Sequence, residues 1–349
     1  MARKKLRLGV IGTGGISRSH MNAWREIDSV QLVAACDIRP EAVQWASKEY
    51  DIPTTYLDLK KMLKKEKLDL VDICTPSGLH YKHTMEVLKQ GCHVVCEKPL
   101  AIKPSHVEKM IEASLKAGKL LCSIQNVRFT PEAMAAKAYI DTGALGKVYY
   151  AHAKYMRRRN MPGRTSFIQK ATAGGGACMD IGVHLLDLTL WFMGNPKPIT
   201  VSGHSDLTLG KRKDLHGNWG EWERDKMEVE DFAVGFVRFD TGAILVLEVS
   251  WLSHVLEMQE TCSEVLGKNA GIKWPSLDIS SEAARMCIDS KLTHVKVDGP
   301  TGHHGQLASV AEAVLKGKKA PVPVKQTLDV IKILDGIYRS TKLGKEVRV

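Results

Sequence analysis

The feature that most constrains this chain lies near its start, where a glycine-rich turn joins a buried strand to a helix. Residues 6–11 form an apolar run that predicts a strand, and the turn Gly12-Thr13-Gly14-Gly15-Ile16-Ser17 leads into a helix that reaches Trp24. A second apolar run over 31–36 ends at Asp37. Strand, glycine turn, helix and strand in this order predict a βαβ unit whose glycines let a pyrophosphate approach the helix N-terminus.

The acidic residue at the end of the second strand indicates which dinucleotide the turn binds. Asp37 is placed to accept hydrogen bonds from both hydroxyls of an adenosine ribose and to repel a 2′-phosphate, which favours NAD over NADP. Arg39, two residues further on, is able to stack on adenine or to bind a 2′-phosphate, so the sequence leaves NADP open. The alternative for Asp37 is a turn residue at a strand end.

The alternation of strands and helices continues to about residue 124. Further strands are predicted at 54–56, 68–74, 93–96 and 120–123, and helices at 40–49, 58–66, 104–117 and from about His80. This pattern predicts a parallel sheet of five or six strands. We therefore expect a dinucleotide-binding Rossmann domain over residues 1–125, followed by a second domain over residues 126–349 that binds substrate and forms oligomers.

Polar residues follow two of the later strands of this sheet. Thr75-Pro76-Ser77 comes after strand 68–74, and Glu97-Lys98-Pro99 comes after strand 93–96. Open α/β sheets bind ligands at the carboxyl ends of their strands. Lys98 is therefore expected to face the nicotinamide and to polarise a substrate oxygen, while Glu97 pairs with it or orients a neighbour. A surface Lys–Glu pair is the alternative.

The second half of the chain has a different pattern. Strands are predicted at 148–156, 199–205, 229–239, 243–250, near 254–266, at 270–274 and at 293–297, with helices at 131–141, 305–316 and 326–342. Consecutive strands joined by short turns indicate an antiparallel sheet. The connection 206–227 carries Trp219 and Trp222 and is long, which favours a lid or an oligomer contact.

Three successive glycines, Gly174-Gly175-Gly176, precede an apolar helix that ends before Gly194. The glycines are expected to let the backbone turn sharply and approach a ligand. Asp180 and His184 lie four residues apart, on one face near the start of the helix. The helix N-terminus favours an ionised Asp180 and a neutral His184, and a neutral imidazole beside a carboxylate is suited to general-base catalysis near pH 7. A core helix with a buried histidine is the alternative.

Composition excludes several classes of protein. The chain is 44% hydrophobic and 26% charged, and this composition is typical of soluble globular proteins. Its net charge of +11 is dispersed and accompanies no nucleic-acid motif, and no apolar run reaches the length of a membrane span. The eight cysteines lack disulfide or zinc spacing. We therefore predict no nucleic-acid or membrane partner, no bound metal and a cytoplasmic location.

Arg157-Arg158-Arg159 follows the strand at 148–156. One or more of these arginines is able to reach a sugar hydroxyl or an anion, although solvated side chains are the favoured interpretation.

Together these motifs resemble the Gfo/Idh/MocA oxidoreductases, the relatives of glucose–fructose oxidoreductase and inositol dehydrogenase. The resemblance rests on the turn at 12–17, Asp37, Thr75-Pro76-Ser77, His80, Glu97-Lys98-Pro99-Leu100-Ala101, Arg128-Phe129, the triple glycine, and Asp180, Gly182, His184 and Asp187. It covers nearly the whole chain. It implies a Rossmann domain followed by an α/β domain with a largely antiparallel open sheet, through which the chain is expected to form a homodimer or homotetramer.

The resemblance also implies residue roles. Lys98 corresponds to a catalytic lysine, Asp180 to a carboxylate that orients the substrate, and His184 to the acid/base histidine. Residues predicted to bind the cofactor are Gly12, Gly14, Gly15, Ile16, Asp37, Arg39, Thr75, Pro76, Ser77, His80, Glu97 and Lys98. Residues predicted to bind the substrate are Lys98, Arg128, Tyr155, Arg157, Asp180 and His184. Ser17 departs from the glycine that often ends the turn.

The sequence thus predicts an NAD(H)-dependent dehydrogenase that oxidises a hydroxyl of a sugar, sugar derivative or polyol. His184 takes the hydroxyl proton while hydride leaves the same carbon for the nicotinamide, and Lys98 stabilises the developing alkoxide. One alternative is an oxidoreductase or glycosidase with a tightly retained NAD(P). Another is a non-catalytic NAD-sensing regulator on the same fold, which should lack the catalytic groups.

Overall fold

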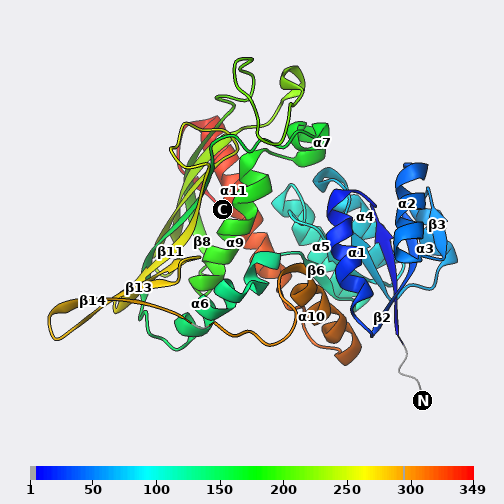
Figure 1. The fold of residues 1–349 in the computed structure, drawn as a ribbon, viewed down its shortest axis with the longest axis horizontal. Helices are drawn as coiled ribbons and strands as arrows, with labels where there is room; N and C mark the ends of the chain where they lie inside the picture. The colour runs from blue at the N-terminus through cyan, green and yellow to red at the C-terminus, as the bar shows by residue number, and fades with distance from the viewer. Residues whose placement is uncertain (1–4, 294) are drawn as a thin grey trace. The chain divides into compact units, whose positions relative to one another are not determined.

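The computed structural model describes residues 5–293 and 295–349, which fall into two compact units (Figure 1). The first unit contains the chain up to Phe129 together with Gly299–Thr327. The second contains Thr130–Asp298 and Leu328–Val349. Each unit is built on its own sheet. Within the described chain, every helix is too short or too polar to cross a membrane.

The first unit is a doubly wound parallel sheet with the strand order β3-β2-β1-β4-β5-β6. Its strands are β1 (Leu6–Ile11), β2 (Val30–Cys36), β3 (Thr54–Tyr56), β4 (Leu70–Ile73), β5 (His93–Cys96) and β6 (Leu121–Ser123). Its helices include α1 (Gly15–Arg25), α2 (Pro40–Tyr50), α3 (Leu59–Lys65), α4 (Ser77–Lys89) and α5 (Pro104–Ala117). The strand order reverses between β1 and β4, which is where this kind of sheet binds ligands. The prediction of a parallel sheet with five or six strands is confirmed, and the sheet has six.

The first unit also contains α10 (Gly302–Lys316), which the sequence analysis assigned to the second domain. This helix packs against α1 and against the 3-10 turn Asn126–Phe129. Its Leu307 and Val310 are fully buried in the same apolar cluster as Trp24. The observed units therefore differ from the predicted 1–125 and 126–349 division, because apolar surface left open by α1 is covered by a helix from far along the chain.

The second unit is a nine-stranded sheet with the order β14-β13-β12-β11-β7-β10-β9-β8-β15. Its strands are β7 (Val148–Arg157), β8 (Pro198–Asp206), β9 (Phe232–Phe239), β10 (Ile244–Ser250), β11 (Gln259–Gly267), β12 (Ala270–Trp274), β13 (Asp278–Ala283), β14 (Met286–Lys291) and β15 (Val347–Arg348). Neighbouring strands are antiparallel except β7 and β10. The expected largely antiparallel sheet is confirmed.

Helices cover one face of this second sheet. They are α6 (Pro131–Asp141), α9 (Val183–Phe192) and α11 (Val324–Leu343), and Figure 1 shows them on the same side of the strands. Two short helices, α7 (Thr165–Ile168) and α8 (Lys170–Ala173), precede the triple glycine. Beneath α9 the sheet presents Ala151 and Ala153 of β7 beside Leu245 and Leu247 of β10, all fully buried. Alternation of inward and outward residues along each strand places them on the helix-covered face.

The predicted strand over 293–297 is wrong. Residue 294 lies outside the described residues, and its described neighbours in this range are irregular, whereas β13 and β14 form a hairpin over 278–291. All six residues of β14 are exposed. Because this hairpin is held by pairing at a sheet edge and buries little apolar surface, its sequence lacks the hydrophobic alternation by which strands are recognised.

We expect Leu307→Ala to lower the free energy of unfolding of the first unit by roughly 2–5 kcal/mol, because it opens a cavity under α10. Urea denaturation measures this change. Leu315→Ala in the same helix is the matched control, since Leu315 is 37% exposed, and it should change stability by less than about 0.5 kcal/mol. Equal effects of the two substitutions would contradict the packing of α10 in this core.

Candidate active site

In the glycine turn between β1 and α1, Gly12 is required by the protein's own backbone, whereas Gly14 borders open space. Gly12 has φ +86°, and a Cβ there would lie 2.8 Å from the carbonyl oxygen of Cys74. A Cβ on Gly14 would meet only the Arg39 guanidinium, at 4.0 Å, so the protein leaves space in front of this residue. Ser17, which replaces the third glycine, donates its hydroxyl hydrogen to the carbonyl oxygen of Gly14 at 2.7 Å. The helix N-terminus has no side-chain cap, so its N–H groups suit a bound phosphate.

Asp37 lies beside this turn at the end of β2. Its carboxylate accepts the backbone N–H of Thr13 and of Arg39, each at 2.9 Å. The Arg39 guanidinium contacts the same carboxylate at 3.2 and 3.3 Å. Burial alone would raise the pKa of Asp37, but these hydrogen bonds lower it. The group is therefore ionised at neutral pH.

His80 is held by backbone groups of the first unit, and its predicted contact with the cofactor stays a prediction. It is buried in α4, and its ring nitrogens lie 2.7 Å from the carbonyl oxygens of Thr75 and Pro99. The hydroxyl of Thr75 in turn contacts His83 at 3.2 Å. The histidine ring thus ties the segment after β4 to the segment after β5. Pro76 is exposed and Ser77 begins α4, so this part of the predicted cofactor edge remains accessible.

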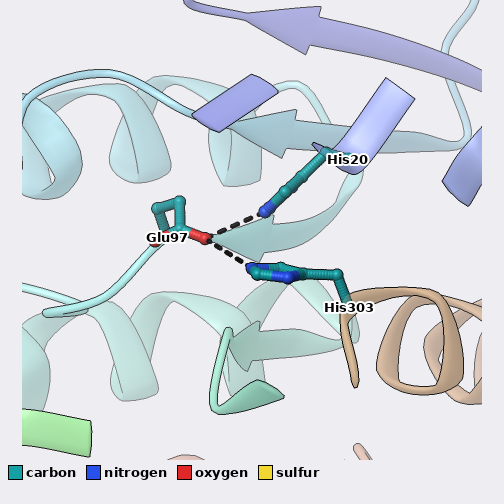
Figure 2. A group of neighbouring side chains, drawn as sticks. All are labelled: His20, Glu97 and His303. Atoms are coloured by element: carbon teal, nitrogen blue, oxygen red, sulfur yellow. Dashed lines mark hydrogen bonds and ion pairs between the residues drawn. The ribbon is translucent and has the colours of Figure 1, made fainter. Parts of the chain in front are cut away.

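Glu97, directly before Lys98, is held by two histidines (Figure 2). Its Oε1 lies 2.9 Å from Nε2 of His20 and 3.9 Å from Nε2 of His303. Its Oε2 accepts the backbone N–H of Lys98 at 3.1 Å. Figure 2 shows the two histidines reaching Glu97 from separate helices, α1 and α10. Glu97 is buried, and these contacts suit it to orient its neighbours, while its predicted contact with the cofactor stays a prediction.

The chain of contacts continues beyond His20. Nδ1 of His20 lies 2.9 Å from Oδ2 of Asp72, which also accepts the Trp24 indole N–H at 2.7 Å. Burial works against a charged imidazole, yet the charge of Asp72 raises the pKa of His20 well above its ordinary value. Burial would likewise raise the pKa of Glu97, but the hydrogen bond and charge of His20 bring it to about 2. An imidazolium therefore bridges two buried carboxylates.

His20 and His303 also belong to groups of side chains whose atoms are of the kinds that bind metals. One is His20, Glu97 and His303, and the other is His20, Asp72 and Cys74, with the ligand atoms of each group within 4.8 Å of one another. Both groups depend on His20, and a protonated imidazole has no lone pair for a metal. Hydrogen bonds account for the contacts of His20, and His303 adds a longer contact to Glu97. The absence of a bound metal stays a prediction.

Lys98 follows Glu97 at the carboxyl end of β5 and is half-buried. Its peptide bond to Pro99 is cis. Sequence reasoning found Glu97 and Lys98 but missed His20, Asp72 and His303. The available signal was a histidine on the buried face of an amphipathic helix, because a buried imidazole needs a polar partner. Nothing local identified the partner.

In the second unit, the triple glycine makes room for protein groups, and the predicted approach to a ligand is wrong for Gly175 and Gly176. A Cβ on Gly176 would lie 1.7 Å from the carbonyl oxygen of Glu230, and one on Gly175 would lie 2.0 Å from the hydroxyl oxygen of Tyr338. The Glu230 carboxyl oxygens accept the N–H groups of Gly176 at 2.9 Å and Cys178 at 3.0 Å.

Glu230 therefore caps the helix that follows the glycines. Tyr338 donates its hydroxyl hydrogen to Glu230 at 2.8 Å, and both residues lie in the second unit. Burial raises the pKa of Glu230, while its hydrogen bonds from Gly176 and Tyr338 act in the opposite direction. A cap of this kind satisfies N–H groups that the first turn of a helix leaves without partners. Sequence analysis missed both Glu230 and Tyr338.

Asp180 and His184 are the open positions of this helical segment. Cys178–Gly182 form a π-turn that continues directly into α9. Among residues 175–190, only Asp180 and His184 are not buried. The Trp251 indole N–H donates to Oδ2 of Asp180 at 3.1 Å. The two predicted catalytic residues of this unit thus share the accessible side of an otherwise apolar segment, and π-turns often occur at functional sites.

Gly182 lies between these two residues. A Cβ there would lie 3.4 Å from Val249 of β10, so the segment packs closely on the sheet at this point.

The remaining predicted substrate residues are placed as follows. Arg128 is buried in the first unit and donates to Oε1 of Gln326 at 2.7 Å. In the second unit, Arg157 donates to the Tyr155 hydroxyl at 3.0 Å. The favoured interpretation of solvated arginines is wrong for Arg157 and Arg159, which are only 8% and 9% exposed, and holds for Arg158. Strand β7 ends in this stretch, and neighbouring chain segments bury its side chains.

Comparison with known proteins places this geometry in a family. Residues 6–125 match the model of an oxidoreductase family with an NAD-binding Rossmann fold, and residues 133–273 match the GFO/IDH/MocA C-terminal domain. A D-glucoside 3-dehydrogenase of Escherichia coli is 34% identical over 272 residues, covering 78% of this chain and 77% of that protein. A myo-inositol 2-dehydrogenase of Thermotoga maritima is 27% identical, over 70% and 68% of the two chains.

Solved structures agree on the fold. A levoglucosan dehydrogenase in complex with NADH and levoglucosan has a TM-score of 0.84 at 22% identity, covering 99% of this chain and all of the other. An oxidoreductase domain protein from Kribbella flavida has a TM-score of 0.86 at 23% identity, with 99% of both chains covered. The fold and glycine turn define a two-domain, NAD-binding oxidoreductase. The chain belongs to the Gfo/Idh/MocA family.

We expect His20→Gln to lower the free energy of unfolding by roughly 3–5 kcal/mol, because it leaves two buried carboxylates without their shared cation. The His20 charge contributes fully below its ordinary pKa of 6.5 and is lost as pH rises through its raised pKa. The Glu97 charge contributes fully above its ordinary pKa of 4.5 and is lost as pH falls toward 2. The stability difference between the proteins should therefore peak between pH 4.5 and 6.5.

Urea denaturation at a series of pH values measures this difference. His216→Gln is the control, because His216 is exposed and its loss should leave stability nearly unchanged. A difference that is independent of pH, or as small as that of the control, would contradict the bridging imidazolium.

Proposed function

We propose that this protein is an NAD(H)-dependent dehydrogenase that oxidises a ring hydroxyl of a sugar, with D-glucosides as the first substrate class to test. The observation that carries the proposal is the pair Asp180 and His184, the only accessible side chains of a segment otherwise buried from 175 to 190. The similarity to a D-glucoside 3-dehydrogenase over most of both chains supports the substrate class. Inositols and other polyols are the related class, supported by the myo-inositol relative.

The cofactor fits the groups of the first unit. The space in front of Gly14, the uncapped start of α1 and the ionised Asp37 suit a pyrophosphate followed by an adenosine ribose. Gly12, Gly14 and Gly15 would hold the pyrophosphate, and Asp37 the ribose. When bound, the nicotinamide supplies the hydride acceptor. The Asp37–Arg39 pair favours NAD, because Arg39 is engaged by a carboxylate of the protein.

Each catalytic role is assigned to a group of this chain. His184 takes the proton of the substrate hydroxyl as general base, a contribution of roughly 10²–10⁴-fold. Asp180, fixed by the Trp251 indole, orients that hydroxyl. Lys98, whose backbone is fixed by Glu97, stabilises the negative charge that develops on the substrate oxygen.

We also propose that the chain forms a homodimer or homotetramer through the sheet of its second unit. The face opposite α6, α9 and α11 carries half-buried apolar side chains, among them Tyr150, Val246 and Phe236. Light scattering should give a multiple of the 38.6 kDa chain mass. Val246→Lys should shift the protein toward the monomer, and Ile288→Lys on exposed β14 should not. A wild-type monomer would contradict this assembly.

A cytoplasmic location is part of the proposal. All eight cysteines are unpaired, and the exposed Cys287 thiol is of a kind that persists in a reducing compartment.

We expect Lys98→Met and His184→Ala each to abolish NADH formation with glucosides while leaving NAD affinity within about twofold, because both act on the substrate oxygen. Turnover is followed by NADH absorbance and cofactor binding by calorimetry. Gly14→Val is the opposite case, since it should weaken NAD binding. Near-wild-type turnover by either Lys98→Met or His184→Ala would refute the role given to that residue.

A further inference from the structure

The long connection between β8 and β9 is a folded segment of the second unit. The carboxyl group of Asp231 accepts the backbone N–H groups of Thr208 and Leu209 at 3.2 and 2.8 Å. The buried Trp222 donates its indole N–H to the carbonyl oxygen of Gly210 at 2.7 Å. These contacts hold the segment against the strands instead of leaving it as a loose loop.

Trp219 lies at the accessible part of this segment. The neighbouring Asn218 donates its backbone N–H to the carbonyl oxygen of Arg159 at 2.8 Å, which fixes the segment beside the end of β7. The Trp219 side chain is 55% exposed. A large aromatic side chain is therefore presented to solvent from a backbone that is anchored.

Trp219 packs against Arg157. The guanidinium of Arg157 is buried between aromatic rings. Its guanidinium carbon lies 4.7 Å from the ring centre of Trp219 and 4.8 Å from that of Tyr155. Within the described chain it forms no ion pair with a carboxylate; its hydrogen bonds go to the Tyr155 hydroxyl and, at 3.4 Å, to Gln259. Aromatic faces offset part of the cost of burying a guanidinium.

Arg157 also has hydrogen-bonding capacity to spare. A guanidinium has five N–H donors, and the two hydrogen bonds of Arg157 use two of them. Although the side chain is only 8% exposed, Nη1, which forms no hydrogen bond within the described chain, is not fully buried. A donor that still reaches the surface is available to an acceptor on a bound ligand.

This cluster adjoins Asp180 through the sheet. Strands β7 and β10 are parallel, with Tyr155 paired to Val249 and Met156 to Ser250. Arg157 ends β7 and Trp251 directly follows β10, at the point where this parallel pairing stops. Trp251 donates to Asp180 and Arg157 packs on Trp219, so these two pairs of side chains stand at the ends of neighbouring strands in the second unit.

We infer that Trp219, Arg157 and Tyr155 form a subsite for the group attached to the anomeric oxygen of a glycoside. A second sugar ring stacks its C–H face on Trp219, and Arg157 donates N–H groups to its oxygen atoms. The inference rests on the proposed function, since it takes Asp180 to hold the ring that is oxidised. It identifies the preferred substrates as glycosides with a ring-shaped aglycone, such as disaccharides.

Calorimetry on the full chain saturated with NADH tests this subsite, because binding is then measured without turnover. The probes are cellobiose, which has a second ring, and methyl glucoside, which has none. Trp219→Ala should raise the Kd of cellobiose by roughly tenfold and leave that of methyl glucoside within about twofold. Trp219→Phe should retain most of the cellobiose affinity. Tyr149→Ala is the control, because Tyr149 is an aromatic residue of similar exposure (51%) on β7.

Each other result overturns the subsite. An equal loss for both sugars would mean that Trp219 only holds Arg157 in place, and no loss for either would mean that Trp219 touches no ligand. A wild-type protein that binds methyl glucoside as tightly as cellobiose would also refute it. NADH formation from methyl glucoside tests the proposed function separately, since that sugar has no second ring to stack on Trp219.

Discussion

A buried positive charge on His20 connects the parts of the first unit that carry its chemistry. The imidazolium bridges Asp72 at the end of β4 and Glu97 at the end of β5, and it belongs to the helix that starts at the glycine turn. His303 brings α10 to the same carboxylate. A buried charge is tolerated only with partners in close geometry, so none of these elements can shift without exposing an unpaired ion. The backbone of Lys98 is fixed in turn, because its N–H donates to the Glu97 carboxylate.

In the second unit, a buried carboxyl group likewise holds the segment that carries Asp180 and His184. There the carboxyl group of Glu230 meets backbone N–H groups at the start of a helix, and Tyr338 closes the contact from α11. In both units a buried carboxyl group lies close to a residue assigned to the reaction. Glu97 directly precedes Lys98, and Glu230 binds the helical turn that carries Asp180. The side chains to which we assign the reaction are left accessible, while the carboxyl groups near them are enclosed. This separation allows a precise site on a segment whose packing is otherwise that of a hydrophobic core.

The sequence predicted the parts of the fold that depend on local pattern. The strand over 6–11, the turn after it and the helix over 104–117 follow from apolar periodicity and glycine placement, and the structure confirms them. Long-range partners were not predictable in this way. The return of α10 to the first unit depends on apolar surface near Trp24, and the role of Gly176 depends on Glu230, 54 residues away. A glycine run signals that something approaches the backbone, but the run does not identify the approaching group.

The nearly complete burial of residues 175–190 has a consequence for how such a protein changes over time. Almost any substitution on that segment disturbs packing before it alters recognition, so the segment is constrained by stability as well as by chemistry. At Trp219 packing imposes less constraint, because this side chain is half exposed to solvent. New substrate preferences are therefore expected to arise by changes in that connection, on a reaction centre that stays fixed.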